Sequence, residues 1–432
     1  MLFGPSRERS FLRVRLKIKP IITISLMLLC LVVGSCASAP DFDAHLGSIV
    51  KPHCFSVASW EFETLSTEIR ESIFKADGKI EDELGLVREY FTYVERIKIL
   101  KPEIEAIKTG SRQGDLASLE AQLTDLERRK ADLEDKVERI IARQITETLT
   151  QLEIFNPLNE YIKLKAVFPP LNFKLEKPPN LLEISPRDRI ESIREVLLKP
   201  DTNLEEKEDI EARVDKLGVS SLVVTLGGVA TYPSFVTDDI GLRFTINAAT
   251  EEWVHQYLTF TPLGFLYLLN LTGVSPNYEI AMMNETLASM VSKEIGAIVY
   301  DKYYSQYETG DNQNQAATPE FDFNREMREI RKAVDRYLEE GKVEQAEEFM
   351  EQKRQYLASK GYYLRKLNQA YFAFYGTYAD SPTSVSPIGL ELKELRNQSA
   401  SLKAFLNTVA AMTSHEDLKA ALSKGETAEP RD

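Results

Sequence analysis

Cysteine and histidine are scarce in this chain of 432 residues, which contains three Cys and four His. Thiolate metal sites and disulfide frameworks need more cysteines, so both are excluded. Long hydrophobic runs are also lacking, because the uninterrupted one, from Ile21 to Val33, is shorter than the roughly 20 residues of a membrane-spanning helix. The full chain is 43% hydrophobic and 28% charged, which is typical of a folded soluble protein and excludes a multi-span membrane protein or a disordered chain.

Clusters of basic residues are absent beyond the N-terminus. Without residues 1–35 the chain has 47 basic and 66 acidic residues, a net charge near −19. An acidic surface repels the phosphates of nucleic acids, so no nucleic-acid partner is expected.

The N-terminus has the layout of a secretory signal, with six basic residues ahead of the apolar run. Val33-Gly34-Ser35-Cys36 closes the run and resembles the lipobox of bacterial lipoproteins. That resemblance implies a signal peptide over 1–35, acylation of Cys36, and a mature protein anchored by lipid to a membrane of the cell envelope. An ordinary signal peptide, cut after the Ala-x-Ala-like region from Ser35 to Ala39, is the alternative. Residues 36–58 are expected to form a tether.

Residues 59–155 have the spacing of two long helices separated by a turn at 109–114. In the second helix Leu119, Leu126, Leu133 and Ile140 recur every seven residues, as in a coiled coil. A short connection favours antiparallel neighbours, so the segment is predicted to be a helical hairpin or coiled coil that packs on its own chain. A homo-oligomer formed through this hairpin, or a spacer from the membrane, remains the alternative.

Prolines mark a boundary between residues 156 and 200, and a core is predicted over 156–310. Strands are expected at Ser220–Leu226, Ala230–Val236 and Leu242–Ile246, with helices at Arg187–Leu198 and Leu204–Leu217. A C-terminal helical bundle is predicted over 311–432, with a helical pair hinged at a glycine. The fold class is therefore mainly α with a small β-sheet, or α+β.

Glu251-Glu252-Trp253-Val254-His255 is the stretch with the clearest chemistry. On a helix Glu251 and His255 lie one turn apart on the same face, so both can reach one metal ion. The stretch resembles the H-E-x-x-H motif of zinc peptidases, with Glu251 in place of the first His. In such peptidases the residue at the position of Glu252 is the general base that takes a proton from the attacking water.

Asn284-Glu285-Thr286-Leu287-Ala288 is a second half-motif on a predicted helix. It is similar to the N-E-x-x-[AS] sequence from which gluzincin metallopeptidases take their third metal ligand. The resemblance implies a zincin-like core, metal ligation by Glu251, His255 and Glu285, catalysis by Glu252, and a peptide or protein substrate. The C-terminal helices also resemble those of predicted envelope peptidases. Tyr371 or Tyr375 would then donate a hydrogen bond to the oxyanion, unless these aromatic residues only pack in the core.

The carboxylate at position 251 changes the expected metal chemistry. A second carboxylate makes bound zinc a weaker Lewis acid and shifts preference toward manganese or iron. Two non-enzymatic alternatives therefore stay open: a pseudoenzyme that binds peptides or envelope partners, and a structural coiled-coil lipoprotein. A third alternative is that His255 is an ordinary histidine on an amphipathic helix. A di-iron bundle is excluded because its second Glu-x-x-His unit is missing.

Overall fold

The computed structural model describes residues 40–57, 82–157, 165–305, 321–379 and 381–426. Within these ranges the chain forms thirteen helices and two three-stranded sheets, which confirms the predicted mainly helical α+β fold. The helices are α2 (Pro40–Val50), α4 (Glu83–Lys108), α5 (Leu116–Gln151), α7 (Leu204–Asp215), α8 (Leu242–Leu258), α9 (Pro262–Leu271), α10 (Tyr278–Tyr303), α11 (Phe323–Glu339), α12 (Val343–Ser359), α13 (Gln369–Gly376), α14 (Ile388–Gln398), α15 (Leu402–Ala410) and α16 (His415–Glu426). The strands are β1 (Phe173–Leu175), β2 (Asn180–Pro186), β3 (Arg194–Leu198), β4 (Val219–Thr225), β5 (Gly228–Val229) and β6 (Ser234–Val236).

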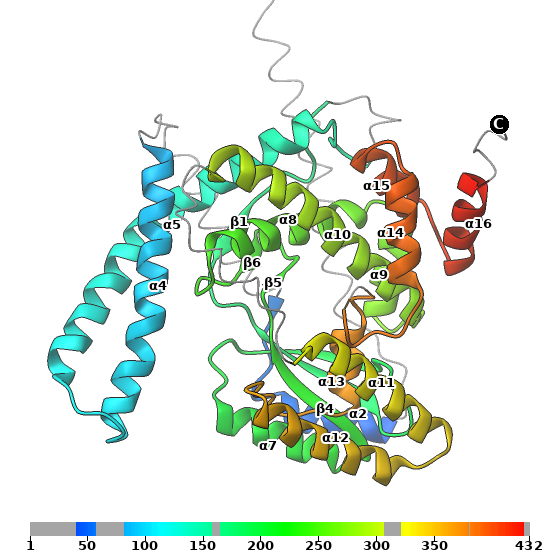
Figure 1. The fold of residues 1–432 in the computed structure, drawn as a ribbon, viewed down its shortest axis with the longest axis horizontal. Coiled ribbons are helices and arrows are strands. Elements are labelled where there is room, and N and C mark those ends of the chain that lie inside the picture. The colour runs from blue at the N-terminus through cyan, green and yellow to red at the C-terminus, as the bar shows by residue number, and fades with distance from the viewer. Residues whose placement is uncertain (1–39, 58–81, 158–164, 306–320, 380, 427–432) are drawn as a thin grey trace, which may run out of the picture.

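Helices α4 and α5 form the predicted hairpin, an arm at the left of Figure 1. Each begins at an aspartate whose carboxylate accepts a hydrogen bond from the first turn, Asp82 in α4 and Asp115 in α5. The far end of the arm is mostly exposed, whereas the C-terminal half of α5 is buried in the body of the protein. The hairpin therefore packs on its own chain, as expected. The predicted helical residues 59–81 lie outside the described ranges.

Helix α10 is the centre of the largest hydrophobic core. It packs along α8, and α5, α9, α14, α15 and α16 surround it (Figure 1). The small sheet, in the order β1-β6-β5, lies against α8. The strand predicted at Leu242–Ile246 is wrong, because these residues form the first turn of α8 with Gly241 as N-cap. In this turn Thr245 and Ile246 are buried on the same side as Ala249, which a helical spacing allows.

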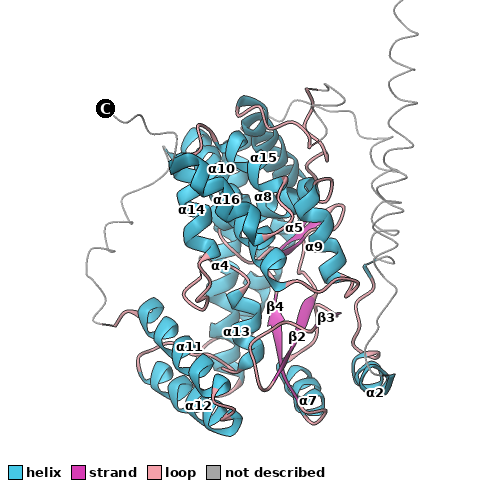
Figure 2. Cartoon of the chain, turned by 90° about the vertical axis from the view of Figure 1, so that its right-hand side faces the viewer, coloured by secondary structure: helices cyan, strands magenta, loops and turns pink. Residues whose placement is uncertain are grey.

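The second sheet, in the order β3-β2-β4, has a different set of helices on each face. Leu182 and Ile184 of β2 pack with α2 and α7, whereas Leu181 packs toward Ala370 of α13. Helices α11 and α12 lie beyond α13 and form their own core with it (Figure 2). The glycine between α11 and α12, Gly341, has a φ of 71°, which explains why the predicted hinge falls there.

Two further expectations differ from the structure. The helix predicted at Arg187–Leu198 is wrong, because residues 194–198 form β3, which pairs antiparallel with β2. The tether expected over 36–58 is folded in its described part. There α2 packs Leu46 and Ile49 into the core beside α7, and Cys54 forms a β-bridge with Leu198.

The helices of the predicted C-terminal bundle do not pack together as one bundle. They divide between the part of the molecule around the second sheet and the part around α10. Helices α11 and α12 pack with α13 beside the second sheet, whereas α14, α15 and α16 pack around α10. No helix in the described ranges is long and apolar enough to cross a membrane. After α13 the chain passes from the part around the second sheet to the part around α10.

Candidate metal centre

Helices α8 and α10 bring together all four residues that the sequence singles out at this site. Glu251, Glu252 and His255 lie on α8, and Glu285 lies on α10, which begins at Asn277 as its N-cap. The two helices approach closely because a glycine, Gly296, faces α8. A Cβ at Gly296 would collide with the side chain of Asn247. Close packing of the two helices therefore places the motif of one opposite the motif of the other.

Glu251, His255 and Glu285 form a group that can hold a metal ion. Each offers one ligand atom, and the three atoms lie within 4.8 Å of one another. The Nε2 atom of His255 is 3.6 Å from Oε2 of Glu285, which is longer than a hydrogen bond. Two ligand atoms on one tetrahedral zinc ion are about 3.4 Å apart, given bonds of about 2.0–2.1 Å. The donor set and its spacing fit a divalent metal ion.

A buried asparagine orients the ring of His255. The Oδ1 atom of Asn284 is 2.9 Å from Nδ1 of His255, and Asn284 is 1% exposed. Because Oδ1 is an acceptor, Nδ1 carries the proton of the neutral imidazole, which leaves Nε2 with its lone pair toward Glu285. This is the tautomer that a metal ligand needs, and such outer partners fix ring orientation in metal sites.

The carboxylates of α8 lie where their charges are poorly solvated. Burial raises the pKa of Glu251 to about 7. His255 acts to lower this pKa, and Glu285 acts to raise it. The hydroxyl of Ser292 on α10 donates to Glu251 over 3.4 Å. Burial also raises the pKa of Glu252, and repulsion from Glu251 and Glu285 raises it further. A cation between these groups would offset both the desolvation and the repulsion.

Strand β5 passes directly beside Glu252. A Cβ added to Gly228 would collide with the Glu252 carboxylate, so only a glycine lets this strand come so close. The sequence contains the pair Gly227-Gly228, and its position after a strand was the only signal of this approach. Glu252 is thus held between β5 and the metal group.

Two tyrosines that the sequence did not single out contact the third ligand. The hydroxyl of Tyr267 on α9 donates to Oε1 of Glu285, and the Tyr267 ring stacks near His255 with centroids 6.0 Å apart. Tyr378, just after α13, also interacts with Glu285, and burial together with Glu285 raises its pKa well above 10. Both hydroxyls are therefore protonated donors beside the site.

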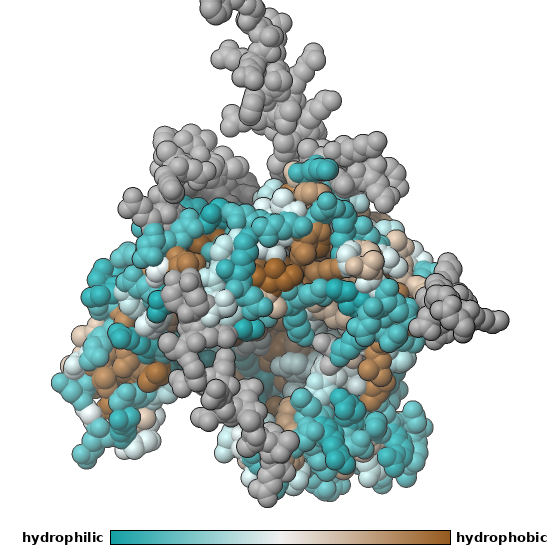
Figure 3. Space-filling model, turned by 45° about the horizontal axis from the view of Figure 1, so that its top comes forward, coloured by the Kyte–Doolittle hydropathy of each residue, from teal (hydrophilic) through white to brown (hydrophobic). Residues whose placement is uncertain are grey.

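The metal group is partly accessible to solvent. The side chains of His255 and Glu285 are 12% and 13% exposed. Figure 3 shows the surface of the protein hollowed near the middle of this view.

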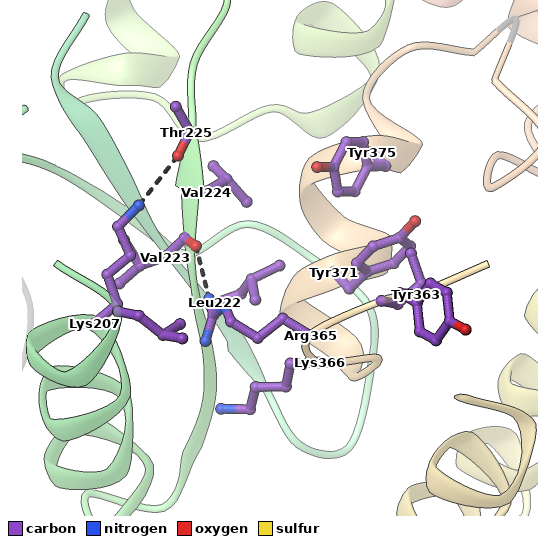
Figure 4. Close-up of a pocket in the computed structure, with 12 residues that line it drawn as sticks. Lys207, Leu222, Val223, Val224, Thr225, Tyr363, Arg365, Lys366, Tyr371 and Tyr375 are labelled. Atoms are coloured by element: carbon purple, nitrogen blue, oxygen red, sulfur yellow. Dashed lines mark hydrogen bonds between the residues drawn. The ribbon is translucent and has the colours of Figure 1, made fainter. Parts of the chain in front are cut away.

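The tyrosines that were expected to serve as oxyanion donors line a different cavity. Tyr371 and Tyr375 lie with Tyr363 around a space of about 350 Å³ between β4 and α13 (Figure 4). Of the two cationic side chains that Figure 4 shows bonded there, Arg365 is paired with Glu211, and Lys207 donates to Thr225. Since both side chains already have partners within the protein, we assign no ligand to this cavity. Tyr378, which interacts with Glu285, is instead the tyrosine that lies beside the metal group with Tyr267.

Comparisons with known proteins give no relative: no family model, no curated protein and no solved structure matches the chain. Cys36, the predicted site of lipidation, lies outside the described residues. Cys54 is a free, exposed cysteine at the β-bridge with β3. The geometry of the site is therefore the basis for any functional assignment.

Proposed function

We propose that the protein is a metal-dependent peptidase of the cell envelope. The observation that carries the proposal is the Glu251, His255 and Glu285 group, with Glu252 beside it on the same helix. Zinc is the first choice of metal, and manganese or iron suit a set with two carboxylates and one imidazole. A bound ion would supply Lewis acidity for hydrolysis of a peptide bond.

The chain's own residues would share the remaining work. Glu252 would take a proton from the attacking water and later give it to the leaving amine. Tyr267 donates its single hydroxyl proton to Glu285, and Tyr378 also interacts with Glu285, so both tyrosines would position this ligand. Asn284 keeps the Nε2 atom of His255 free for ligation.

The place of action is proposed from the sequence of the N-terminus. The lipobox-like Val33-Gly34-Ser35-Cys36 supports a lipoprotein anchored to an envelope membrane, with peptides or proteins as substrates. An oligomer through the hairpin is proposed only as a secondary feature. Mass spectrometry of the protein from cell membranes tests the anchor, since a diacylated or triacylated N-terminal Cys36 is expected.

A second candidate is a peptidase-like protein that binds a metal and a peptide without hydrolysis. It is favoured by one observation, the carboxylate of Glu251 where zinc peptidases have a neutral imidazole, because the added negative charge weakens the Lewis acid. The two candidates share every ligand and differ only in turnover.

Metal content and hydrolysis, measured on the same preparations, test both candidates. We expect about one equivalent of metal in the wild type and in Glu252→Gln, and none in Glu285→Ala. Cleavage of a mixture of unstructured peptides, followed by mass spectrometry, is expected for the wild type and not for Glu252→Gln. Asp301→Asn removes an exposed carboxylate of α10 and serves as the matched control. Metal binding without cleavage would favour the second candidate, and absence of metal would reject both.

A further inference from the structure

A long uncharged stretch of sequence surrounds helix α9. Residues 256–278 contain no Asp, Glu, Lys, Arg or His, and this is the longest such stretch in a chain that is 28% charged. A helix at a protein surface ordinarily has charged or polar side chains on its outer face. The sequence of α9, PLGFLYLLNL, contains only one amide and one phenol as polar side chains, so this helix lacks a polar outer face.

The side of α9 that faces away from the core is exposed, as is the turn that follows the helix. Within α9 only Leu263 and Gly264 are buried. Phe265 is 50% exposed, Leu271 is 43% exposed and Val274 is 64% exposed. Single exposed apolar residues are common on protein surfaces, but here three large ones follow one another without a charged residue among them. We call Phe265, Leu271 and Val274 the α9 surface.

The proposed lipid anchor would hold the folded protein close to a membrane. Cys36 precedes Pro40, the first residue of α2, by four residues, so the acylated residue would lie at most about 14 Å from the start of α2. Helix α2 is not a free stalk, because Leu46 and Ile49 pack into the core beside α7. A connection this short requires that some face of the folded protein lies against the bilayer.

Charge and position favour the α9 surface as that face. The chain after residue 35 has a net charge near −19, so anionic lipid headgroups repel most of its surface. The α9 surface carries no charge to be repelled, and contact with lipid removes its apolar area from water. In Figure 2, α9 and α2 both lie in the right-hand half of the view. The anchor and the α9 surface can therefore reach one membrane together.

We propose that the α9 surface lies in the headgroup region of the bilayer to which acylated Cys36 anchors the protein. This inference rests on the lipid anchor in the proposed function and does not depend on peptide cleavage. Tyr267 on the same helix donates to Glu285, so the contact would also hold the metal group near the membrane surface. A protein partner fits less well, because the surface offers no charged group with which such a partner could pair.

Fluorescence quenching in vesicles tests this contact in the full chain. The protein is expressed with its own N-terminus, extracted from bacterial membranes and reconstituted into vesicles of phosphatidylglycerol and phosphatidylcholine, with or without bromine on the acyl chains of the phosphatidylcholine. Phe265→Trp and Val274→Trp add reporters to the α9 surface. Tyr363→Trp is the matched control, because Tyr363 is 84% exposed between α12 and α13. Wild type gives the background fluorescence of the two native tryptophans.

The fluorescence added by both reporters is expected to be lost in brominated vesicles, whereas that added by Tyr363→Trp is retained. Retention at both reporters in protein that mass spectrometry shows to be acylated at Cys36 would overturn the proposal and leave the anchor in place. Equal loss at all three positions would also overturn it, because no particular face would then meet the lipid.

The remaining outcomes separate the contact from the anchor and from a protein partner. Loss at the reporters in protein without acyl groups would support the contact and reject only the anchor. Protein without acyl groups that does not float with vesicles would overturn both. Reporters that are shielded from acrylamide yet not quenched by brominated lipid would assign the α9 surface to a protein partner instead. The second reporter keeps the test decisive if one variant does not fold.

Discussion

Replacement of Asn284 by alanine isolates the contribution of ring orientation to metal affinity. The substitution removes the oxygen 2.9 Å from Nδ1 of His255 and leaves all three ligands in place. Loss of such an outer partner costs about 10–100-fold in metal affinity, which is about 1.4–2.7 kcal/mol. We therefore expect the dissociation constant for zinc to rise by that factor, and we expect Asn284→Asp, which keeps the acceptor, to bind within a few-fold of wild type.

Competition with a fluorescent chelator measures these dissociation constants. Asn277→Ala is the control, since it removes the N-cap of the same helix, seven residues away. Loss of this cap costs about 1 kcal/mol of stability and is expected to leave metal affinity unchanged. Weaker metal binding in Asn284→Ala, together with unchanged metal binding in Asn277→Ala, would separate the effect of ring orientation from that of helix stability. The reasoning is refuted if folded Asn284→Ala binds zinc within twofold of wild type.

Three further predictions concern the ion and the stability of the fold. Removal of the ion with a chelator is expected to lower the unfolding free energy by about 2.7 kcal/mol, relative to free metal at about 100 times its dissociation constant. Thermal melts measure this change, and an equal change on addition of the chelator to Glu285→Ala would contradict the prediction. Arg365→Ala is expected to cost about 3 kcal/mol of stability in urea unfolding, because Glu211, which is 3% exposed, loses its bidentate ion pair. Arg365→Lys should cost less, and an equal cost of the two substitutions would argue against the bidentate geometry. His415→Ala is expected to raise amide hydrogen exchange in α16, since buried His415 bonds to carboxylates on α10 and α14; unchanged protection would show that packing alone holds this helix.

The parts of the fold that the sequence predicted depend on local spacing. The seven-residue repeat over Leu119–Ile140 gives α5, and Glu251 and His255 share a face because a helix has 3.6 residues per turn. Glu285 was found through the apolar spacing of its own helix. These patterns need no knowledge of tertiary contacts, so they survive in the structure.

The parts that failed depend on contacts between distant segments. Residues 194–198 have no strand alternation of their own and become β3 only because β2 offers an edge. Leu242–Ile246 is too short to distinguish a strand from one helical turn. Tyr267 and Tyr378 reach Glu285 from separate elements, and Glu183 meets Glu195 only through strand register. No pattern along the chain reports such meetings.

The central position of α10 has a consequence for how mutations accumulate. This helix touches six other helices and also carries Asn284 and Glu285. Most substitutions in it would reduce the folded population before they altered any chemistry. Selection for folding alone would thus preserve the backbone geometry of the site across many generations, even in a lineage that no longer needed the reaction. Substitutions would then accumulate only at polar side chains that packing does not require, above all Glu252 and Glu285. The residues found at these two positions in diverged copies of this chain would therefore record whether the chemistry is still under selection.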